Sequence, residues 1–390
     1  MSLKRKALEA LLQPPHGGRR IALVSETELE FHNKYGRDLV QRQDYHQILN
    51  SVVRLIREGA AGCGEDVNTD CAEMSLSIRV WASRYLSPDL ELLSCEQLRT
   101  LIAKLDGFCV QMEWKELRLL LTPDVRTQFG LYVGELLIHL TVYEWLFQNP
   151  FWYLDGKDGP TDADEDPTFA RKLGYLFDRL YKTNPTYAVL WRMQTQRLAN
   201  STDPEYTPDV EFGESNSKRL RAAASRFADR LLITEPFCWL LKDPGSSPQT
   251  GHCRDKLRDI FHKAIRAMIN CETRTNGQPV LRGIDELGGV FRENSKHVTL
   301  TPYAFRPRLD LYNGQRIIFV SRPSLVYVDS IIAHDLITKT VATEVMGAQV
   351  MPEYVPEAAV REKDEIDVQE KAQQSAGDDK DEGTVDLPGC

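Results

Sequence analysis

The stretch Phe129–Phe147, FGLYVGELLIHLTVYEWLF, is the most apolar part of the chain and bears most directly on the fold. Its 19 residues are long enough to cross a bilayer, but they include Glu135, His139 and Glu144, and each of these side chains is costly to place in hydrocarbon. We therefore predict a helix buried in a protein core, with no transmembrane segment and no membrane partner.

Helical patterns extend on both sides of this stretch, from about residue 25 to about residue 310. Ser94 and Gln97 have the spacing of a capping box, and Gly107 is suited to end the helix that they begin. Further helices are expected at about residues 45–55, 71–86, 112–121, 124–148, 167–182, 185–199, 214–242 and 253–272. The predicted fold class is mainly α, a multi-helix body that resembles a bundle.

One segment near the C-terminus has the composition of strands. Arg316–Val320 and Leu325–Val328 are rich in β-branched and aromatic residues, and Ser321-Arg322-Pro323-Ser324 between them suits a turn. We predict a small β-hairpin near residues 316–328. Because an isolated two-stranded hairpin is marginally stable in water, it should pack against the helical body.

The charge of the chain is concentrated at its C-terminal end. The whole chain has 48 Lys and Arg against 57 Asp and Glu, a net charge of −9. Residues 352–390 hold twelve acids and four bases, a net of −8, which leaves −1 for residues 1–351. With few apolar residues, this segment is expected to be disordered. The predicted organisation is a basic, partly disordered N-terminal segment at 1–24, a helical body at 25–350 and an acidic tail at 351–390.

The motifs of the commonest enzyme classes are absent. The sequence has neither a P-loop nor a G-x-G-x-x-G fingerprint, and it has no G-x-S-x-G elbow and no kinase motifs, so no nucleotide cofactor is expected. His252, Cys253 and His262 form the densest His/Cys group, but Cys253 and His262 are nine residues apart and would face opposite sides of a helix. We expect no metal site and no other cofactor.

The cysteine pattern and the N-terminus indicate the compartment. Eight cysteines without a C-x-x-C pair suggest free thiols in a reducing environment. Ala7–Leu12 is too short and too polar for the core of a signal peptide. The expected localisation is cytoplasmic or nuclear, with no secretion. Lys4-Arg5-Lys6 followed by Arg19-Arg20 has the spacing of a bipartite nuclear import signal, and whether it acts as one stays open.

Two groups of residues are candidates for a functional site. Glu135 and His139 are four residues apart on one face of the most apolar helix, a spacing that suits a buried acid–base pair, and Glu144 follows on the same stretch. If the protein is an enzyme, these three side chains should face a cavity. The second group is a basic side of helix 218–230, which would contact phosphates if the protein binds nucleic acid: Lys218, Arg219, Arg221, Arg226 and Arg230.

Two segments resemble parts of a broad set of uncharacterised helical proteins of filamentous fungi. Asn184–Leu198, NPTYAVLWRMQTQRL, is similar to a helix of the form N-x-x-x-A-x-x-W-R-x-Q-T-x-R-L in that set. The region around Asp310, Gly314 and Ile317–Val328 is similar to a stretch near the C-termini of those proteins. The resemblance implies a helical body with a hairpin and a fungal origin, and it brings no activity with it.

Helical spacing predicts how the first of these segments packs. Trp191 and Leu198 are seven residues apart and should both face the core, whereas Arg192 and Gln196 should form the polar side.

Three functions follow from these patterns. The leading hypothesis is an intracellular interaction or regulatory protein without catalytic activity, with a protein as its partner. The alternatives are an enzyme that uses Glu135, His139 and Glu144, and a regulator that binds nucleic acid through the basic helix. The partner, any substrate and the oligomeric state stay open at this stage.

Overall fold

A computed structural model of the chain describes residues 64–157, 166, 168–205, 207–242, 248–275, 277–301, 312–332 and 338–354. The predicted helix at 45–55, the basic segment at 1–24 and the acidic residues beyond 354 lie outside this described part.

The described part is mainly α, as the sequence predicts. Short helical turns η2–η5 accompany the longer helices, at Leu90–Leu92, Arg118–Leu120, Tyr143–Phe147 and Phe237–Leu240. The α-helices of the described residues are α4 Gly64–Tyr85, α5 Cys95–Lys104, α6 Trp114–Leu117, α7 Pro123–Arg126, α8 Phe129–Val142, α9 Phe169–Thr183, α10 Pro185–Ala199, α11 Glu211–Ile233 and α12 Pro248–Arg274.

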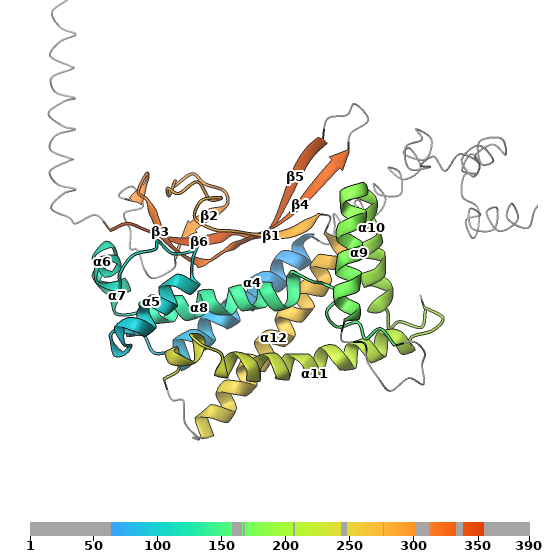
Figure 1. Cartoon of the computed structure of the whole chain (residues 1–390), viewed down its shortest axis with the longest axis horizontal. Coiled ribbons are helices and arrows are strands. Elements are labelled where there is room, and N and C mark those ends of the chain that lie inside the picture. The colour runs from blue at the N-terminus through green and yellow to red at the C-terminus, as the bar shows by residue number, and fades with distance from the viewer. Residues whose placement is uncertain are drawn as a thin grey trace, which may run out of the picture. The chain divides into compact units, whose positions relative to one another are not determined.

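Strands form two small sheets in this part of the chain. The first sheet has the order β1-β4-β5 and is antiparallel, and the second has the order β2-β6-β3, in which only β2 and β6 are parallel. Figure 1 shows the strands along one side of the helices α4, α8 and α12. The strands are β1 Gln278–Arg282, β2 Val298–Leu300, β3 Ile317–Arg322, β4 Ser324–Ile332, β5 Thr338–Met346 and β6 Ala348–Pro352.

The predicted hairpin is wrong in its pairing, although both of its segments are strands. β3 pairs with β6, and β4 pairs with β1 and β5, so the two segments belong to different sheets. A tight hairpin needs residues with positive φ at the turn, and Ser321-Arg322-Pro323-Ser324 offers no glycine or asparagine. The chain therefore passes from one sheet into the other at Pro323.

The bundle-like body is also corrected by these sheets. The six strands of the described residues lie beside the helices, and residues of these strands, including Phe319 and Tyr327, belong to the same core as α4, α8 and α12. The sequence-based prediction missed four of these strands: β1 and β2 lie in a region that was expected to be helical, and β5 and β6 follow the predicted hairpin. Met351 and Pro352 belong to β6, and the backbone N–H of Tyr354 donates to the carbonyl of Leu120, so the ordered body extends past the predicted boundary at 350.

The apolar stretch Phe129–Phe147 forms α8 and the following π-helical turn, and it lies in the core as predicted. Two glycines let the neighbouring chain approach it closely. A Cβ on Gly130 would lie 2.4 Å from the carbonyl oxygen of Ser87, and one on Gly134 would lie 2.0 Å from a methyl group of Leu86. In this way the residues after α4 pack directly on the α8 backbone.

Local signals placed several helix ends well. Ser94 and Gln97 form the predicted capping box at the start of α5, and Gly107 after it has a φ of +80°. Asn184 caps α10, whose first residue is Pro185. The predicted helix 214–242 is wrong at its end, because α11 stops at Ile233 shortly before Pro236. The predicted helix 124–148 is divided into α7 and α8.

Candidate functional site

Glu135, the first candidate of the enzyme hypothesis, is held in an ion pair inside the body. Its side chain is 2% exposed and accepts hydrogen bonds of 2.8 and 3.3 Å from the guanidinium of Arg79 on α4. The same guanidinium donates to the side chain of Gln349 on β6. Burial raises the pKa of Glu135, and Arg79 opposes that shift. This carboxylate joins α4, α8 and β6.

His139 lies one turn later on α8 and is buried. Its pKa is lowered to about 3, first by burial and then by the positive charges of Arg322 and Arg79. The imidazole is therefore neutral at neutral pH, and its Nε2 atom has no hydrogen-bond partner among the described residues.

Glu144 is exposed on the π-helical turn, in contrast to the other two candidates. The three side chains of the enzyme hypothesis are thus not presented together: Glu135 is paired inside, His139 is packed inside, and Glu144 lies at the surface.

A polar cluster that the sequence analysis assigned to the wrong side lies on α10. Arg192 is 1% exposed, and Gln196 is completely buried, whereas Leu198 is 68% exposed. Trp191 packs against the core as predicted, but the prediction that Leu198 faces the core is wrong, and the polar side formed by Arg192 and Gln196 lies in the interior. Hydrophobic spacing failed here because the partners of Arg192 come from distant segments of the chain.

Arg192 forms an ion pair with Glu272 of α12 in the interior. The Nε–Oε2 distance is 2.8 Å, and neither atom has an aligned hydrogen bond, so this is a contact of charges. The guanidinium also donates to the carbonyl of Gly277 and lies 5.2 Å from the centre of the Phe177 ring. The hydroxyl of Tyr327 donates to Glu272 over 2.8 Å. The cluster connects α9, α10, α12 and β4.

Gln196 and Tyr153 extend this buried polar region. The Tyr153 hydroxyl donates to the Gln196 side-chain oxygen over 2.6 Å, and the Gln196 amide donates to the carbonyl of Pro150 over 2.8 Å. Asn200 donates to the Tyr153 hydroxyl. Tyr153, Gln196 and Asn200 each have a hydrogen-bond partner within the chain, and these bonds help to fix the position of α10.

The basic helix 218–230 lies within α11, and its cations have different surroundings. Arg219 is partly buried and forms an ion pair with Asp155. Arg230 lies 4.7 Å from the centre of the Trp145 ring. Lys218, Arg221 and Arg226 are exposed. Arg230 is exposed as well, so four of the five cations are open to solvent, and Arg219 is partly buried in its ion pair.

The described residues contain no cluster of three or more His, Cys, Asp or Glu side chains that is suited to a metal ion. His252, Cys253 and His262 lie on α12, with Cys253 buried and His252 exposed. Among the helices of the described ranges, none combines the length and the apolar character that crossing a bilayer requires.

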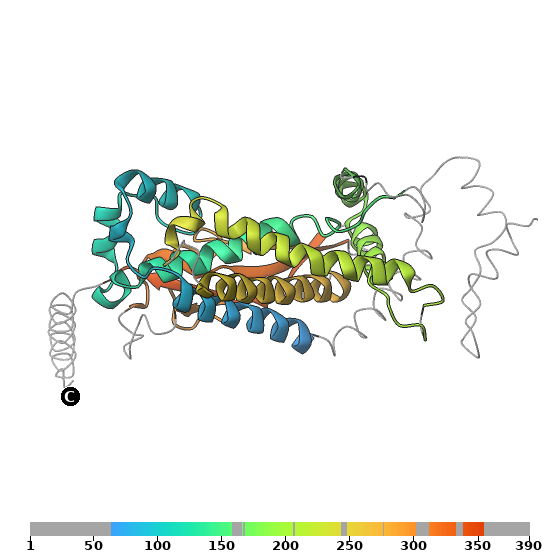
Figure 2. The ribbon, with the colours of Figure 1, turned by 90° about the horizontal axis from the view of Figure 1, so that it is seen from below.

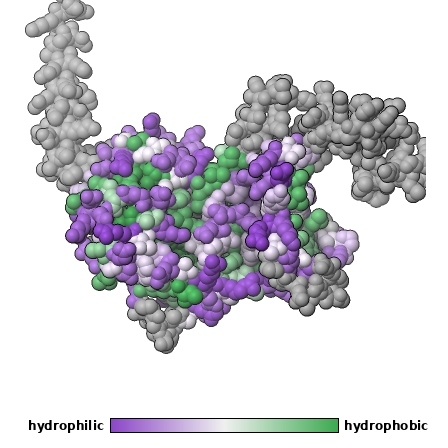
Figure 3. Space-filling view, in the orientation of Figure 1, coloured by the Kyte–Doolittle hydropathy of each residue, from purple (hydrophilic) through white to green (hydrophobic). Residues whose placement is uncertain are grey.

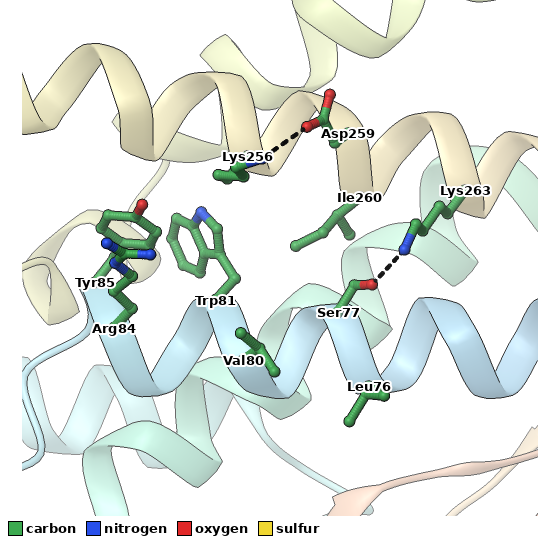
Figure 4. A pocket seen from close by; sticks show the side chains of 10 residues that line it. All are labelled: Leu76, Ser77, Val80, Trp81, Arg84, Tyr85, Lys256, Asp259, Ile260 and Lys263. Carbon is green, nitrogen blue, oxygen red and sulfur yellow. Dashed lines mark hydrogen bonds and ion pairs between the residues drawn. The ribbon is translucent and has the colours of Figure 1, made fainter.

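A groove between α4 and α12 is the surface feature that the sequence analysis missed. The two helices run side by side in opposite directions, with Trp81 near Cys253 and Asp70 near Arg266 (Figure 2). The groove has a volume of about 430 Å³. Its lining residues, drawn in Figure 4, are Leu76, Ser77, Val80, Trp81, Arg84, Tyr85, Lys256, Asp259, Ile260 and Lys263.

The floor of the groove is apolar and well packed. Trp81 and Ile260 are each 2% exposed and lie between the two helices (Figure 4). The indole N–H of Trp81 donates to the carbonyl of Cys253 over 3.0 Å, and its ring stacks on Phe237. Because this hydrogen bond and this ring contact fix the position of Trp81, the floor of the groove is already formed before a ligand binds.

The α4 side of the groove exposes two large apolar side chains. Leu76 is 63% exposed and Val80 is 57% exposed, one turn apart on the same helix. Over the face of the molecule that Figure 3 shows, hydrophilic residues alternate with smaller apolar patches. Leu76 and Val80 differ from scattered exposed residues because they are neighbours beside a concave surface.

The groove also has a cationic lining, mainly on its α12 side. Lys256 and Lys263 lie on α12, and Arg84 lies on α4, against a single acid, Asp259, so the lining has a net charge of +2. Lys256 is 3.6 Å from Asp259, and Lys263 donates to the hydroxyl of Ser77 over 2.8 Å. The groove thus combines an apolar wall with a cationic one. The sequence contained no clear signal for this groove, because Leu76 and Val80 have the same helical spacing as buried residues of α4.

Comparison with known proteins identifies no relative: no family model, no curated protein and no solved structure matches the chain. The function has to be inferred from the geometry of the chain itself.

Proposed function

We propose that the protein is a non-catalytic interaction module that binds an amphipathic, acidic helix of a partner protein in the groove between α4 and α12. The observation that supports this function best is the pair of exposed apolar side chains, Leu76 and Val80, beside a formed apolar floor. Binding would remove both side chains from water, and burial of apolar surface is the main driving force of association.

The dimensions of the groove suit a short helix. Leu76 to Tyr85 covers ten residues of α4, and the nine steps between them correspond to about 14 Å along the helix axis. A ligand of roughly two to three helical turns covers that length. Helices bind in such grooves through apolar residues at i, i+3, i+4 and i+7.

The charges define the chemistry of the partner. An occupant whose apolar face lies on Leu76 and Val80 places its adjacent edge near Lys256 and Lys263. Carboxylates on that edge gain favourable contacts, whereas lysines on it would be repelled. We therefore expect glutamate or aspartate beside the apolar stripe of the ligand.

The direct test is a binding titration with the full chain and a labelled synthetic peptide of about 12 residues, roughly three turns, with leucines at helical spacing and glutamates elsewhere. We expect saturable binding that weakens as salt is added. The double variant Leu76→Asp and Val80→Asp should weaken it about tenfold or more, because it removes the apolar anchors and repels the glutamates.

Two controls make this test specific. Leu198→Asp changes an apolar residue of similar exposure, 68%, outside the groove and should bind the peptide like the unaltered chain. A second peptide, with lysines in place of the glutamates, should bind at least about tenfold more weakly. Equal binding of both peptides, or equal loss in the Leu198→Asp variant, would contradict the proposal.

A further inference from the structure

We propose that residues 362–370 of the same chain occupy this groove and compete with the partner, which makes the acidic C-terminal segment an autoinhibitory element. This inference rests on the proposed function, because it assigns a regulator to the same groove.

The composition of the segment matches the two walls of the groove. Residues 362–370, EKDEIDVQE, hold five acids against one base. Ile366 and Val368 supply apolar side chains among these acids. The cationic lining around Lys256 and Lys263 is complementary to this charge, and Leu76 and Val80 offer apolar contacts.

The segment is also attached close to the folded body. The last described residue, Tyr354, donates its backbone N–H to the carbonyl of Leu120 over 2.8 Å. Between Tyr354 and Glu362 the chain can span about 25 Å when extended. Figures 1 and 2 show that α4 runs toward the end of the body that carries α5 and α6, the end at which Tyr354 is anchored.

Attachment to the same chain strengthens a weak contact. A tethered segment acts at an effective concentration in the millimolar range when the linker is short and flexible. Even a segment of low intrinsic affinity then occupies the groove for much of the time, and the apparent affinity for a partner falls by the fraction of free groove.

The remainder of the C-terminal segment supplies a matched control. Residues 378–386 also contain five acids, Asp378, Asp379, Asp381, Glu382 and Asp386, but Val385 is their only large apolar residue. Neutralising either set of five changes the net charge of the chain by the same amount. A general effect of net charge on the affinity for the peptide should therefore be the same in both variants. Loss of the contact between residues 362–370 and the groove should change that affinity only in the variant that is altered at residues 362–370.

The experiment titrates three full-length chains with the acidic peptide. They are the unaltered chain, a first variant in which the five acids of residues 362–370 are neutralised, and a second variant in which the five acids of residues 378–386 are replaced in the same way. The substitutions of the first variant are Glu362→Gln, Asp364→Asn, Glu365→Gln, Asp367→Asn and Glu370→Gln. We expect the first variant to bind the peptide about fivefold more tightly than the unaltered chain and the second to bind it equally.

A second measurement reads the contact directly. Carbodiimide coupling of the unaltered full chain, followed by mass spectrometry, should join Lys256 or Lys263 to a carboxylate of residues 362–370, and the double variant Leu76→Asp and Val80→Asp should lose these links. If the peptide binds all three chains equally and no such link forms, the autoinhibitory contact is overturned while the groove remains a binding site. If the peptide binds none of the three chains, the proposed function fails. Links from Lys256 or Lys263 to residues 362–370 that form in that case would show that the segment lies in the groove although the groove does not bind the peptide.

Discussion

Helices α10 and α4 both contradict the rule that polar side chains face water and apolar ones face the core. On α10, Arg192 and Gln196 are buried, and each has partners inside the chain. On α4, Leu76 and Val80 are largely exposed beside a groove. A buried charge beside an opposite charge serves the fold. Clustered exposed apolar side chains that no described residue covers indicate a site for a ligand. The two helices differ in the source of their contacts: the partners of Arg192 and Gln196 lie inside the chain, whereas Leu76 and Val80 would be covered only by a ligand.

On α10, a large loss of stability is expected from Arg192→Met. The substitution leaves the Glu272 carboxylate buried without its cation, which should lower the free energy of unfolding by about 3–5 kcal/mol. Chemical denaturation measures this change. The double variant Arg192→Met and Glu272→Met removes both charges and should be clearly more stable than the single variant. Equal stability of the two would show that the ion pair is unimportant for the fold.

His139→Leu should change how stability depends on pH. The folded pKa of His139, about 3, is depressed from 6.5, so its contribution to stability is present above pH 6.5 and is lost as the pH falls toward 3. Between these pH values the unfolded chain binds a proton that the folded chain does not. The free energy of unfolding therefore rises with pH by at most about 1.4 kcal/mol per pH unit through this group. Denaturation at several pH values should show a flatter dependence in the variant.

The control for that slope is Ile138→Val, a neighbouring buried residue without a titrating group. Its loss of stability, about 0.5–1.5 kcal/mol, should be the same at every pH. A parallel pH dependence in His139→Leu and the unaltered chain would refute the role assigned to the buried imidazole.

Tyr327→Phe should have an intermediate effect. It removes the hydroxyl that donates to the buried Glu272 carboxylate over 2.8 Å, which should cost about 1–3 kcal/mol of stability. Tyr143→Phe is the matched control, because the Tyr143 hydroxyl donates over 3.1 Å to a neutral acceptor, the carbonyl of Pro279, at a partly buried position. Thermal or chemical denaturation should show the smaller loss for Tyr143→Phe; the reverse order would argue against a special role of the charged acceptor.

The smallest effect on stability is expected at the groove. Leu76→Asp should change the free energy of unfolding by only about 0.5 kcal/mol, because the side chain is already exposed to water. Ile78→Asp, two residues later on the same helix and fully buried, should prevent stable folding. Circular dichroism melts of the two variants separate these outcomes, and a large loss in Leu76→Asp would show that Leu76 is part of the core.

The positions of many helices followed from local sequence because their signals act within one turn. Ser94 with Gln97 and Asn184 with Pro185 satisfy backbone groups of their own helix, so their role needs no distant partner. The β-branched and aromatic residues of β3 and β4 predicted strands but not the partners of those strands. Pairing of β3 with β6 depends on hydrogen bonds between residues far apart in the chain, and no local pattern specifies them.

The candidate site was accessible to sequence reasoning only in part. Glu135 and His139 were correctly placed on one buried helix, but the sequence did not contain the information that Arg79 neutralises one of them. Leu76 and Val80 have ordinary helical spacing, and a helix pattern does not show which apolar residues its neighbours leave uncovered. That depends on where α12 lies.

The sequence by itself determined a mainly helical body, a buried α8 and a charge that is concentrated after residue 351, because composition and helical periodicity are properties of short segments. Only the tertiary structure decided that Arg192 lies inside, that β3 and β4 separate into two sheets, and that α4 and α12 form a groove. Each of these features depends on contacts between segments far apart in the chain, whose free energy is not encoded in either segment alone.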